Sequence, residues 1–408
     1  MESYNDKTAV LTIFSKNYLH FVRTLFFSVR QYHPEWVRFG LLVDKLYKEF
    51  NPTDEPFNLI EVSQLDLPHP RKFLFRYTQL EANTAVKPYA INHLFDMGFK
   101  RVIYLDPDIF LYHRMDEVDH LLNKGSLMVL TPHLLAPVND NFLPNETSVL
   151  QTGTFNLGFI ALGRHPDLYP FLAWWKDRLE YDCIVDLPGG LFIDQKWLNL
   201  APGLFDDVHI LRHPGYNAAY WNLKQRSISI IRDNWVVNGR PLVFFHFSGL
   251  NPAKPSELSR HQNRFSMSDI GVVQVLVLRY IHELHLNGFE QFKDIPYFFN
   301  YFSDGTPIRD IIRWTYRSSQ ENQKTAGEDP FSSPWDWLNR PGQGQYRKKP
   351  LVTNLMAELW KRRADLQRAF PDPWDRDRNN FCRWFIASAE REMALPSVFI
   401  DPVRNSLL

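Results

Sequence analysis

The chain has 408 residues, with 46 Lys and Arg balanced by 46 Asp and Glu, and hydrophobic residues make up 44% of it. This length predicts two domains, or one large domain with an appendage, and the balanced charge excludes a global positive field that would gather nucleic acid. Cys183 and Cys382 lie far apart and form no CxxC pair, which excludes a thiolate zinc site and argues against a disulfide framework.

The amino terminus, residues 1–7, is polar and lacks a signal-peptide core. No apolar run approaches the roughly 20 residues needed to span a bilayer. We therefore expect a cytoplasmic protein without a transmembrane segment. A peripheral contact with the inner membrane is left open.

The first half of the chain alternates strand and helix patterns. Short β-prone runs predict strands at 8–14, 38–44, 58–62, 101–105, 127–131, 155–162 and 242–247, and apolar periodicity predicts helices at about 18–32, 83–97, 168–181 and 192–200. This rhythm predicts an α/β fold over residues 1–268, Rossmann-like, with a mostly parallel central sheet flanked by helices. Residues 269–408 are helical in pattern and rich in Arg and Trp, which predicts a helical carboxyl-terminal appendage with a polar loop around 318–349.

Two aspartates, Asp106 and Asp108, flank Pro107 directly after the predicted strand at 101–105. Ligands of α/β sheets bind beyond the carboxyl ends of the strands. Carboxylates one residue apart can reach the same hard cation, Mn²⁺ or Mg²⁺, and the proline stiffens the backbone between them. The alternative is an ordinary turn, because Asp and Pro both favour turns.

Other polar residues follow later strands. His246 ends the strand at 242–247 and can serve as a third metal ligand, Gly249 would let backbone approach a phosphate closely, and Lys254 could supply charge to a diphosphate. Asn156 interrupts an apolar strand and needs a partner if it is buried. Asp194 and Gln195 follow two glycines, where an acid at a helix start is the structural alternative.

These motifs occur in the order Asp-x-Asp, Asn-x-Gly, Asp-Gln and His-x-x-Gly followed by Lys-Pro. That series, over residues 8–255, resembles the retaining glycosyltransferases of family 8, typified by glycogenin and the bacterial lipopolysaccharide galactosyltransferases. The resemblance implies a GT-A fold and a distant relationship to enzymes of bacterial polysaccharide biosynthesis. The carboxyl-terminal third lies outside this pattern.

The resemblance also implies roles for single residues. Asp106, Asp108 and His246 would bind manganese, with Asp106 also contacting the donor nucleotide, and Lys254 with the Gly249 backbone would contact the phosphates. Lys87 would lie over the donor, Asp194 would bind sugar hydroxyls, Gln195 would lie beside the anomeric carbon, and Asn156 would touch the donor sugar or the acceptor. Thr12, Phe14 and Asn17 or Tyr18, at the end of the first strand, would hold the nucleotide base.

By this resemblance we expect a metal-dependent hexosyltransferase that moves a sugar from a UDP-linked donor to a glycan or lipid-linked saccharide acceptor with retention. Retention requires no dedicated base, whereas inversion would require a carboxylate, for which Asp194 is the first candidate. Two other functions stay open: a nucleotidyltransferase acting on sugar phosphates, which normally shows a Gly-rich phosphate loop, and a catalytically silent nucleotide-sugar-binding module. The sequence does not specify the donor sugar, the acceptor or the oligomeric state.

Overall fold

The computed structural model describes residues 4, 6–47, 49–332, 336–342 and 349–408 of the chain. They form two compact units, the first within residues 1–67 and 80–297 and the second within residues 68–79 and 298–408. The predicted boundary at 268/269 lies before helix α9 (Val273–Leu286), whereas the units divide after residue 297. Helix α9 belongs to the first unit because its buried face shares a hydrophobic cluster with Phe245 and Phe247.

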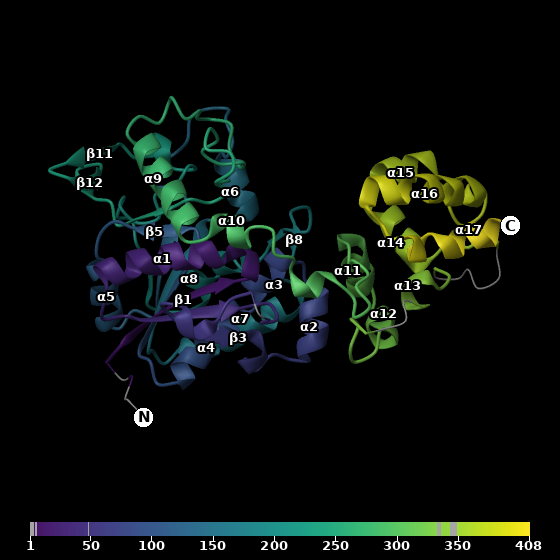
Figure 1. Ribbon diagram of the computed structural model, residues 1–408, viewed down its shortest axis with the longest axis horizontal. Coiled ribbons are helices and arrows are strands. Elements are labelled where there is room, and N and C mark those ends of the chain that lie inside the picture. The colour runs from purple at the N-terminus through teal and green to yellow at the C-terminus, as the bar shows by residue number, and fades with distance from the viewer. Residues whose placement is uncertain (1–3, 5, 48, 333–335, 343–348) are drawn as a thin grey trace. The chain divides into compact units, whose positions relative to one another are not determined.

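A seven-stranded sheet forms the centre of the first unit (Figure 1). Its order is β10–β6–β7–β4–β1–β2–β3, and all neighbours are parallel except β7, which runs antiparallel to β4 and β6. The strands are β1 (Thr8–Phe14), β2 (Val37–Leu42), β3 (Asn58–Glu61), β4 (Arg101–Leu105), β6 (Met128–Pro132), β7 (Phe155–Gly163) and β10 (Val208–Ile210). The predicted mostly parallel α/β sheet is confirmed.

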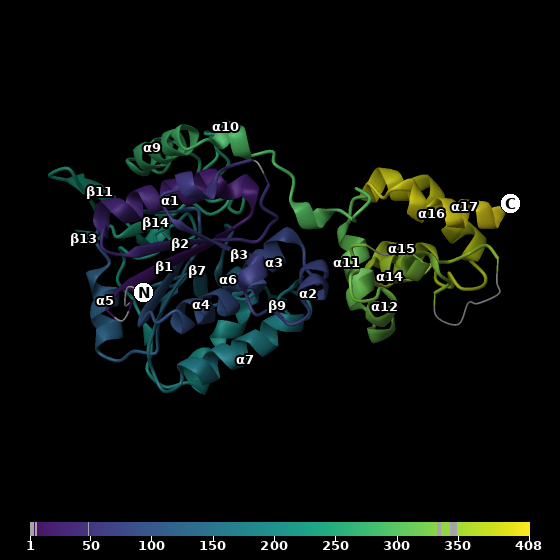
Figure 2. The ribbon, with the colours of Figure 1, turned by 60° about the horizontal axis from the view of Figure 1, so that its bottom comes forward.

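Helices cover both faces of this sheet, and all seven residues of β1 are therefore buried. Figure 2 shows α1 on one side of the sheet and α4 and α7 on the other. The helices of the first unit are α1 (Leu19–Tyr32), α3 (Gln79–Ala85), α4 (Lys87–Asp96), α5 (Asp116–Asn123), α6 (Glu146–Thr152), α7 (Leu168–Tyr181), α8 (Ala201–Leu204), α9 and α10 (Phe289–Phe292). Gln79, the first residue of α3, belongs to the second unit.

Smaller strand pairs lie beside the main sheet. β5 (Ile109–Leu111) pairs antiparallel with β14 (Phe244–His246), so the chain that leaves β4 runs next to the end of β14. The remaining strands are β8 (Val185–Asp186), β9 (Leu191–Phe192), β11 (Ile228–Ile231), β12 (Asn234–Val237) and β13 (Arg240–Pro241). Short 3₁₀ helices are η1 (Lys16–Tyr18), η2 (Pro52–Asp54), η3 (Val62–Gln64), η4 (Lys196–Asn199), η5 (Leu223–Gln225), η6 (Phe298–Asn300) and η7 (Ser397–Phe399).

The second unit is helical. Its helices are α2 (Pro70–Arg76), α11 (Asp310–Arg317), α12 (Gln320–Thr325), α13 (Asp336–Asn339), α14 (Asn354–Arg362), α15 (Ala364–Ala369), α16 (Arg378–Met393) and α17 (Asp401–Leu407). The buried Arg313 donates hydrogen bonds to the carbonyl oxygens of Phe75 (2.6 Å) and Phe299 (2.5 Å), and so fastens residues 68–79 to this unit. The predicted polar loop at 318–349 contains α12 and α13, and its residues 333–335 and 343–348 lie outside the described residues.

Two predicted helices were wrong in detail. The stretch 83–97 is divided between α3 and α4, with Val86 between them. The stretch predicted as a helix at 192–200 is the end of β9 followed by η4, because Gly190 (φ +79°) and Ile193 (φ +43°) hold the backbone in left-handed conformations around this turn.

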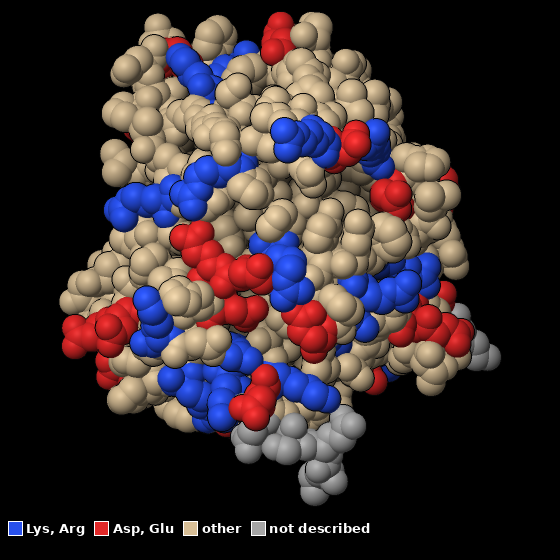
Figure 3. Space-filling model, turned by 90° about the vertical axis from the view of Figure 1, so that its left-hand side faces the viewer, with Lys and Arg blue, Asp and Glu red and all other residues tan. Residues whose placement is uncertain are grey.

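No helix among the described residues is long and apolar enough to cross a membrane. Figure 3 shows one side of the molecule, where Lys and Arg side chains are interspersed with Asp and Glu. This mixture is the surface counterpart of the balanced composition.

Candidate active site

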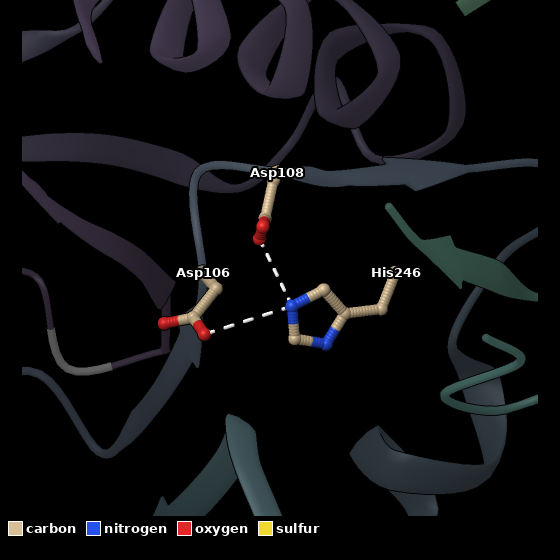
Figure 4. A group of neighbouring side chains, drawn as sticks. All are labelled: Asp106, Asp108 and His246. Carbon is tan, nitrogen blue, oxygen red and sulfur yellow. Dashed lines mark ion pairs between the residues drawn. The ribbon is translucent and has the colours of Figure 1, made fainter. Parts of the chain in front are cut away.

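Asp106, Asp108 and His246 meet beyond the carboxyl end of β4 (Figure 4). The β5–β14 pairing places His246 opposite Ile109, and the Phe247 backbone N–H donates to the Asp108 carbonyl oxygen at 2.8 Å. His246 Nε2 lies 2.9 Å from Asp108 Oδ1 and 3.7 Å from Asp106 Oδ2. One ligand atom from each of the three residues lies within 4.8 Å of the other two.

Burial and charge oppose one another in this cluster. Burial disfavours the charged imidazole of His246, but the Asp108 and Asp106 carboxylates outweigh it, so the pKa of His246 lies above its ordinary value. Burial also raises the pKa of Asp106, although Lys87 and His246 favour its charged form. Two oxygens and one nitrogen arranged in this way match the donor set of a divalent cation such as Mn²⁺.

A buried polar network lies behind His246. His246 Nδ1 lies 3.2 Å from Asn156 Oδ1 and 3.3 Å from Asn217 Oδ1. Asn156 Nδ2 lies 3.3 Å from His133 Nε2, and burial lowers the pKa of His133 to about 4. Asn156 reaches this position because β7 is antiparallel, so its first residues lie at the carboxyl edge of β4 and β6. The network holds the His246 ring through its second nitrogen.

Lys87 and Asp194 form a buried ion pair beside this cluster. Their charged atoms are 2.5 Å apart, and each side chain is 1% exposed. Lys87 Nζ also donates to the Leu157 carbonyl oxygen at 2.9 Å and lies 4.1 Å from the centre of the Tyr104 ring. The Tyr104 hydroxyl donates to Asp106 Oδ1 at 2.6 Å, which links the ion pair to the aspartate cluster. Burial raises the pKa of Asp194 despite the neighbouring ammonium.

Gln195 is held by backbone groups on both sides of its amide. Its Oε1 accepts from the Leu157 N–H at 3.0 Å, and its Nε2 donates to the Thr152 carbonyl oxygen at 3.0 Å. Gly153 packs against this side chain, since a Cβ at that position would lie 3.1 Å from Gln195 Cγ. Gln195 is therefore fixed next to Asn156, 3.4 Å from its Nδ2.

The residues predicted to hold a nucleotide base differ in their surroundings. Thr12 is fully buried, and its hydroxyl has no hydrogen-bond partner within the described part of the chain. The Phe14 ring belongs to the hydrophobic core and packs edge-on against Phe57, so a base could meet only its backbone. Asn17 is half-buried, and Tyr18 is 38% exposed and stacked on Phe21.

The loop after β14 carries the predicted phosphate contacts. Gly249 has a φ of +71°, and a Cβ there would lie 2.4 Å from His261 Cδ2, so the chain packs closely at this turn. Lys254 is exposed, and its contact among the described residues is an ion pair with Glu257 at 3.6 Å. The Arg260 backbone N–H donates to the Gly249 carbonyl oxygen at 3.2 Å, which places a second, unpredicted cation on the same loop.

The structure thus brings together Asp106, Asp108, His246, Asn156, Gln195, Lys87 and Asp194. Sequence reasoning missed Tyr104, His133 and Asn217. Tyr104 carried a usable signal, because it precedes Asp106 by two residues and so points to the same face of the strand. Asn217 lies in a segment without periodicity and gave no such signal.

No known protein-family profile matches the chain. Two proteins of Bacillus subtilis (strain 168), both named uncharacterized, are similar in sequence. YfnF is 28% identical over 270 residues, and the match covers 62% of this chain and 85% of YfnF. YfnD is 22% identical over 279 residues, and the match covers 67% of this chain and 87% of YfnD.

Two solved structures are distantly similar. Galactosyltransferase LgtC, in complex with donor and acceptor sugar analogs, is 14% identical to this chain. The match covers 71% of this chain and 97% of the LgtC chain, with a TM-score of 0.39. The glycosyltransferase GlyE of Streptococcus pneumoniae TIGR4 is 15% identical to this chain. The match covers 72% of this chain and 66% of the GlyE chain, with a TM-score of 0.38.

Proposed function

We propose that this chain is a metal-dependent glycosyltransferase of the GT-A type, which transfers a sugar from a nucleotide-sugar donor to a glycan or lipid-linked saccharide acceptor. The observation that carries the proposal is the convergence of Asp106, Asp108 and His246 within 4.8 Å at the carboxyl edge of the sheet. The order of motifs in the sequence, which resembles family 8 glycosyltransferases, supports the same function.

The three residues fit a divalent cation for an electrostatic reason. Asn156 and Asn217 present oxygens to His246 Nδ1, so that nitrogen carries the hydrogen and Nε2 directs its lone pair toward the carboxylates. Nε2 of the neutral ring lies 2.9 Å from an oxygen of Asp108, and two lone pairs at that distance repel unless a proton or a metal ion lies between them. A divalent cation is the positive charge that His246, Asp106 and Asp108 can share. We propose Mn²⁺ for this charge, with Mg²⁺ as the alternative.

When bound, the metal would act as a Lewis acid that neutralises the charge developing on a departing nucleoside diphosphate. The exposed cations Lys254 and Arg260, on the loop that follows His246, are the side chains that we propose to contact the phosphates. Tyr18 offers its exposed ring to the nucleotide base, and Thr12 and Phe14 at the end of β1 complete that site together with Asn17 of η1. We propose a UDP-linked donor on the basis of the family resemblance.

Gln195 and Asn156 are proposed to face the sugar and the acceptor, and Asp194 with Lys87 to order the sugar hydroxyls. Asp194 is poorly suited to act as a general base, because its carboxylate is engaged by the Lys87 ammonium at 2.5 Å. Without a base, the acceptor hydroxyl gives its proton to the leaving phosphate oxygen and attacks on the same face. We therefore propose retention of the anomeric configuration.

A thermal-shift screen of nucleotide sugars, with and without Mn²⁺, tests the function. We expect a nucleotide sugar to raise the melting temperature of the wild type only when Mn²⁺ is present, because a ligand that binds the native state stabilises it. Asp108→Asn should lose this response, while Asp54→Asn, an exposed aspartate in η2, should keep it. A wild type that no nucleotide sugar stabilises would refute the proposal.

The stereochemical part has its own test. Proton NMR of the glycosidic product made by the wild type, compared with the anomeric configuration of the donor, distinguishes retention from inversion. An inverted product would refute the retaining scheme and would require a base that the scheme does not contain.

A further inference from the structure

Asn217 occupies an unusual place behind the proposed metal site. It lies between β10 and η5, is 1% exposed, and has a φ of +54°, in the left-handed region that Asn tolerates better than most residues. Its side chain is held between β6 and His246. A buried amide in this position must have all of its polar atoms satisfied.

The orientation of two amides follows from one backbone group. The Gly158 N–H can only donate, and it lies 3.2 Å from Asn156 Oδ1, so the oxygen of the Asn156 amide faces that way. The same oxygen lies 3.0 Å from the Asn217 side-chain nitrogen, which must therefore be the donor. Asn217 Nδ2 also donates to Thr131 Oγ1 at 2.9 Å.

With Nδ2 used in this way, the Asn217 oxygen is left facing His246 Nδ1 at 3.3 Å. Asn156 Oδ1 faces the same nitrogen at 3.2 Å. Two oxygens that can only accept require His246 Nδ1 to carry a hydrogen. The lone pair of the neutral ring is then on Nε2, which is the nitrogen nearest Asp106 and Asp108.

We propose that Asn217 is a positioning residue for His246: its side-chain oxygen, together with that of Asn156, keeps the hydrogen on Nδ1 and so directs the Nε2 lone pair at the metal. This inference rests on the proposed metal site. Partners of this kind fix both the tautomer and the orientation of a ligating imidazole, and losing one typically weakens metal binding by about 10- to 100-fold.

The test is a titration of the full-length, nucleotide-free protein with Mn²⁺, in which electron paramagnetic resonance measures the free ion. Asn217→Gly removes the amide without straining the left-handed backbone, and we expect its Kd for Mn²⁺ to rise by about 10- to 100-fold. Asn238→Gly is the matched control. Asn238 also has a positive φ (+50°) but is exposed in the turn after β12, so its Kd should equal that of the wild type.

A second variant separates positioning from a merely structural role. Asn217→Asp keeps an oxygen that accepts the Nδ1 hydrogen but loses both hydrogen bonds that the amide donates. Positioning predicts a Kd within about threefold of the wild type, because a carboxylate partner increases the basicity of the ligand. A structural role of the donated hydrogen bonds predicts a Kd raised tenfold or more over that of the wild type, and this comparison with the wild type decides even if the glycine variant does not fold.

The outcomes distinguish the two proposals. Wild-type protein that does not bind Mn²⁺ would refute the metal site and with it the proposed function. Wild-type protein that binds Mn²⁺, with Asn217→Gly binding it equally well or Asn217→Asp weakened tenfold or more, would refute only the role of Asn217. Melting curves in EDTA show whether each variant is folded before metal is added.

Discussion

Replacing Lys87 by Met removes one partner of the buried ion pair with Asp194. Both side chains are 1% exposed and their charged atoms are 2.5 Å apart, so the variant leaves a carboxylate in the interior without its counter-charge. Breaking a buried pair in this way costs about 3–5 kcal/mol of stability. The hydrogen bond from Lys87 Nζ to the Leu157 carbonyl is lost as well, which places the expected effect in the upper part of that range.

The loss should depend on pH in a defined direction. Burial already raises the pKa of Asp194 in the folded protein, and removing the Lys87 ammonium raises it further. A folded carboxyl whose pKa lies above its unfolded value of about 3.9 binds its proton more tightly than the unfolded chain does. Folding of Lys87→Met is therefore least affected below that value, and its stability falls as the pH rises through the folded pKa.

Urea unfolding of the full chain, with calorimetry to follow the first unit separately, measures this effect at pH 5 and pH 8. Adding Asp194→Asn to Lys87→Met removes the unpaired charge, and we expect the double variant to regain most of the loss. Lys293→Met, which removes the partner of the exposed Glu290, is the control and should change stability little. A loss below about 1 kcal/mol at pH 8, or one independent of pH, would refute the buried pair.

Gly158→Ala should weaken Mn²⁺ binding about tenfold or more, because the added Cβ would lie 2.3 Å from His246 Cε1. Gly203→Ala is the control, because a Cβ there meets nothing within 4 Å. Equal Kd values for the two variants in a Mn²⁺ titration would contradict this prediction. The Kd of the wild type for Mn²⁺ should rise as the pH falls below the raised pKa of His246, because a proton competes for Nε2, and a Kd constant from pH 8 to pH 5 would show that His246 is not a ligand. Arg313→Met should cost about 3 kcal/mol or more and speed tryptic cleavage in residues 68–79, and unchanged cleavage would contradict its anchoring role.

Much of the fold could be predicted from the sequence because its signals are local. The strand at 8–14 is a continuous apolar run, and the helix at 168–181 has the bounds that its pattern predicts. The stretch 192–200 failed because the left-handed residues Gly190 and Ile193 end the apolar pattern in turns rather than a helix. A left-handed Ile is not a feature that residue preferences can predict.

The site was predictable where strand ends determine position. Asp106 and Asp108 follow a parallel strand, and residues at such ends converge. His246 needed more, since it reaches the aspartates through the antiparallel pairing of β5 with β14, which no local pattern encodes. Asn217 could not be predicted, because its contact with Asn156 joins residues 61 positions apart in the sequence. Lys254 was predicted to contact phosphates, but in the structure it is exposed and forms an ion pair with Glu257.

Release of a nucleoside diphosphate from nucleotide sugars tests the central claim most directly. Wild-type protein and Asp108→Asn would be incubated with a panel of UDP-, GDP-, ADP- and dTDP-sugars, with a saccharide acceptor mixture and with either Mn²⁺ or EDTA. We predict that the wild type releases the nucleoside diphosphate from at least one donor only with Mn²⁺, and that Asp108→Asn is slower by about 100-fold or more. Equal release in EDTA, release of pyrophosphate instead, or no release from any donor would contradict the account.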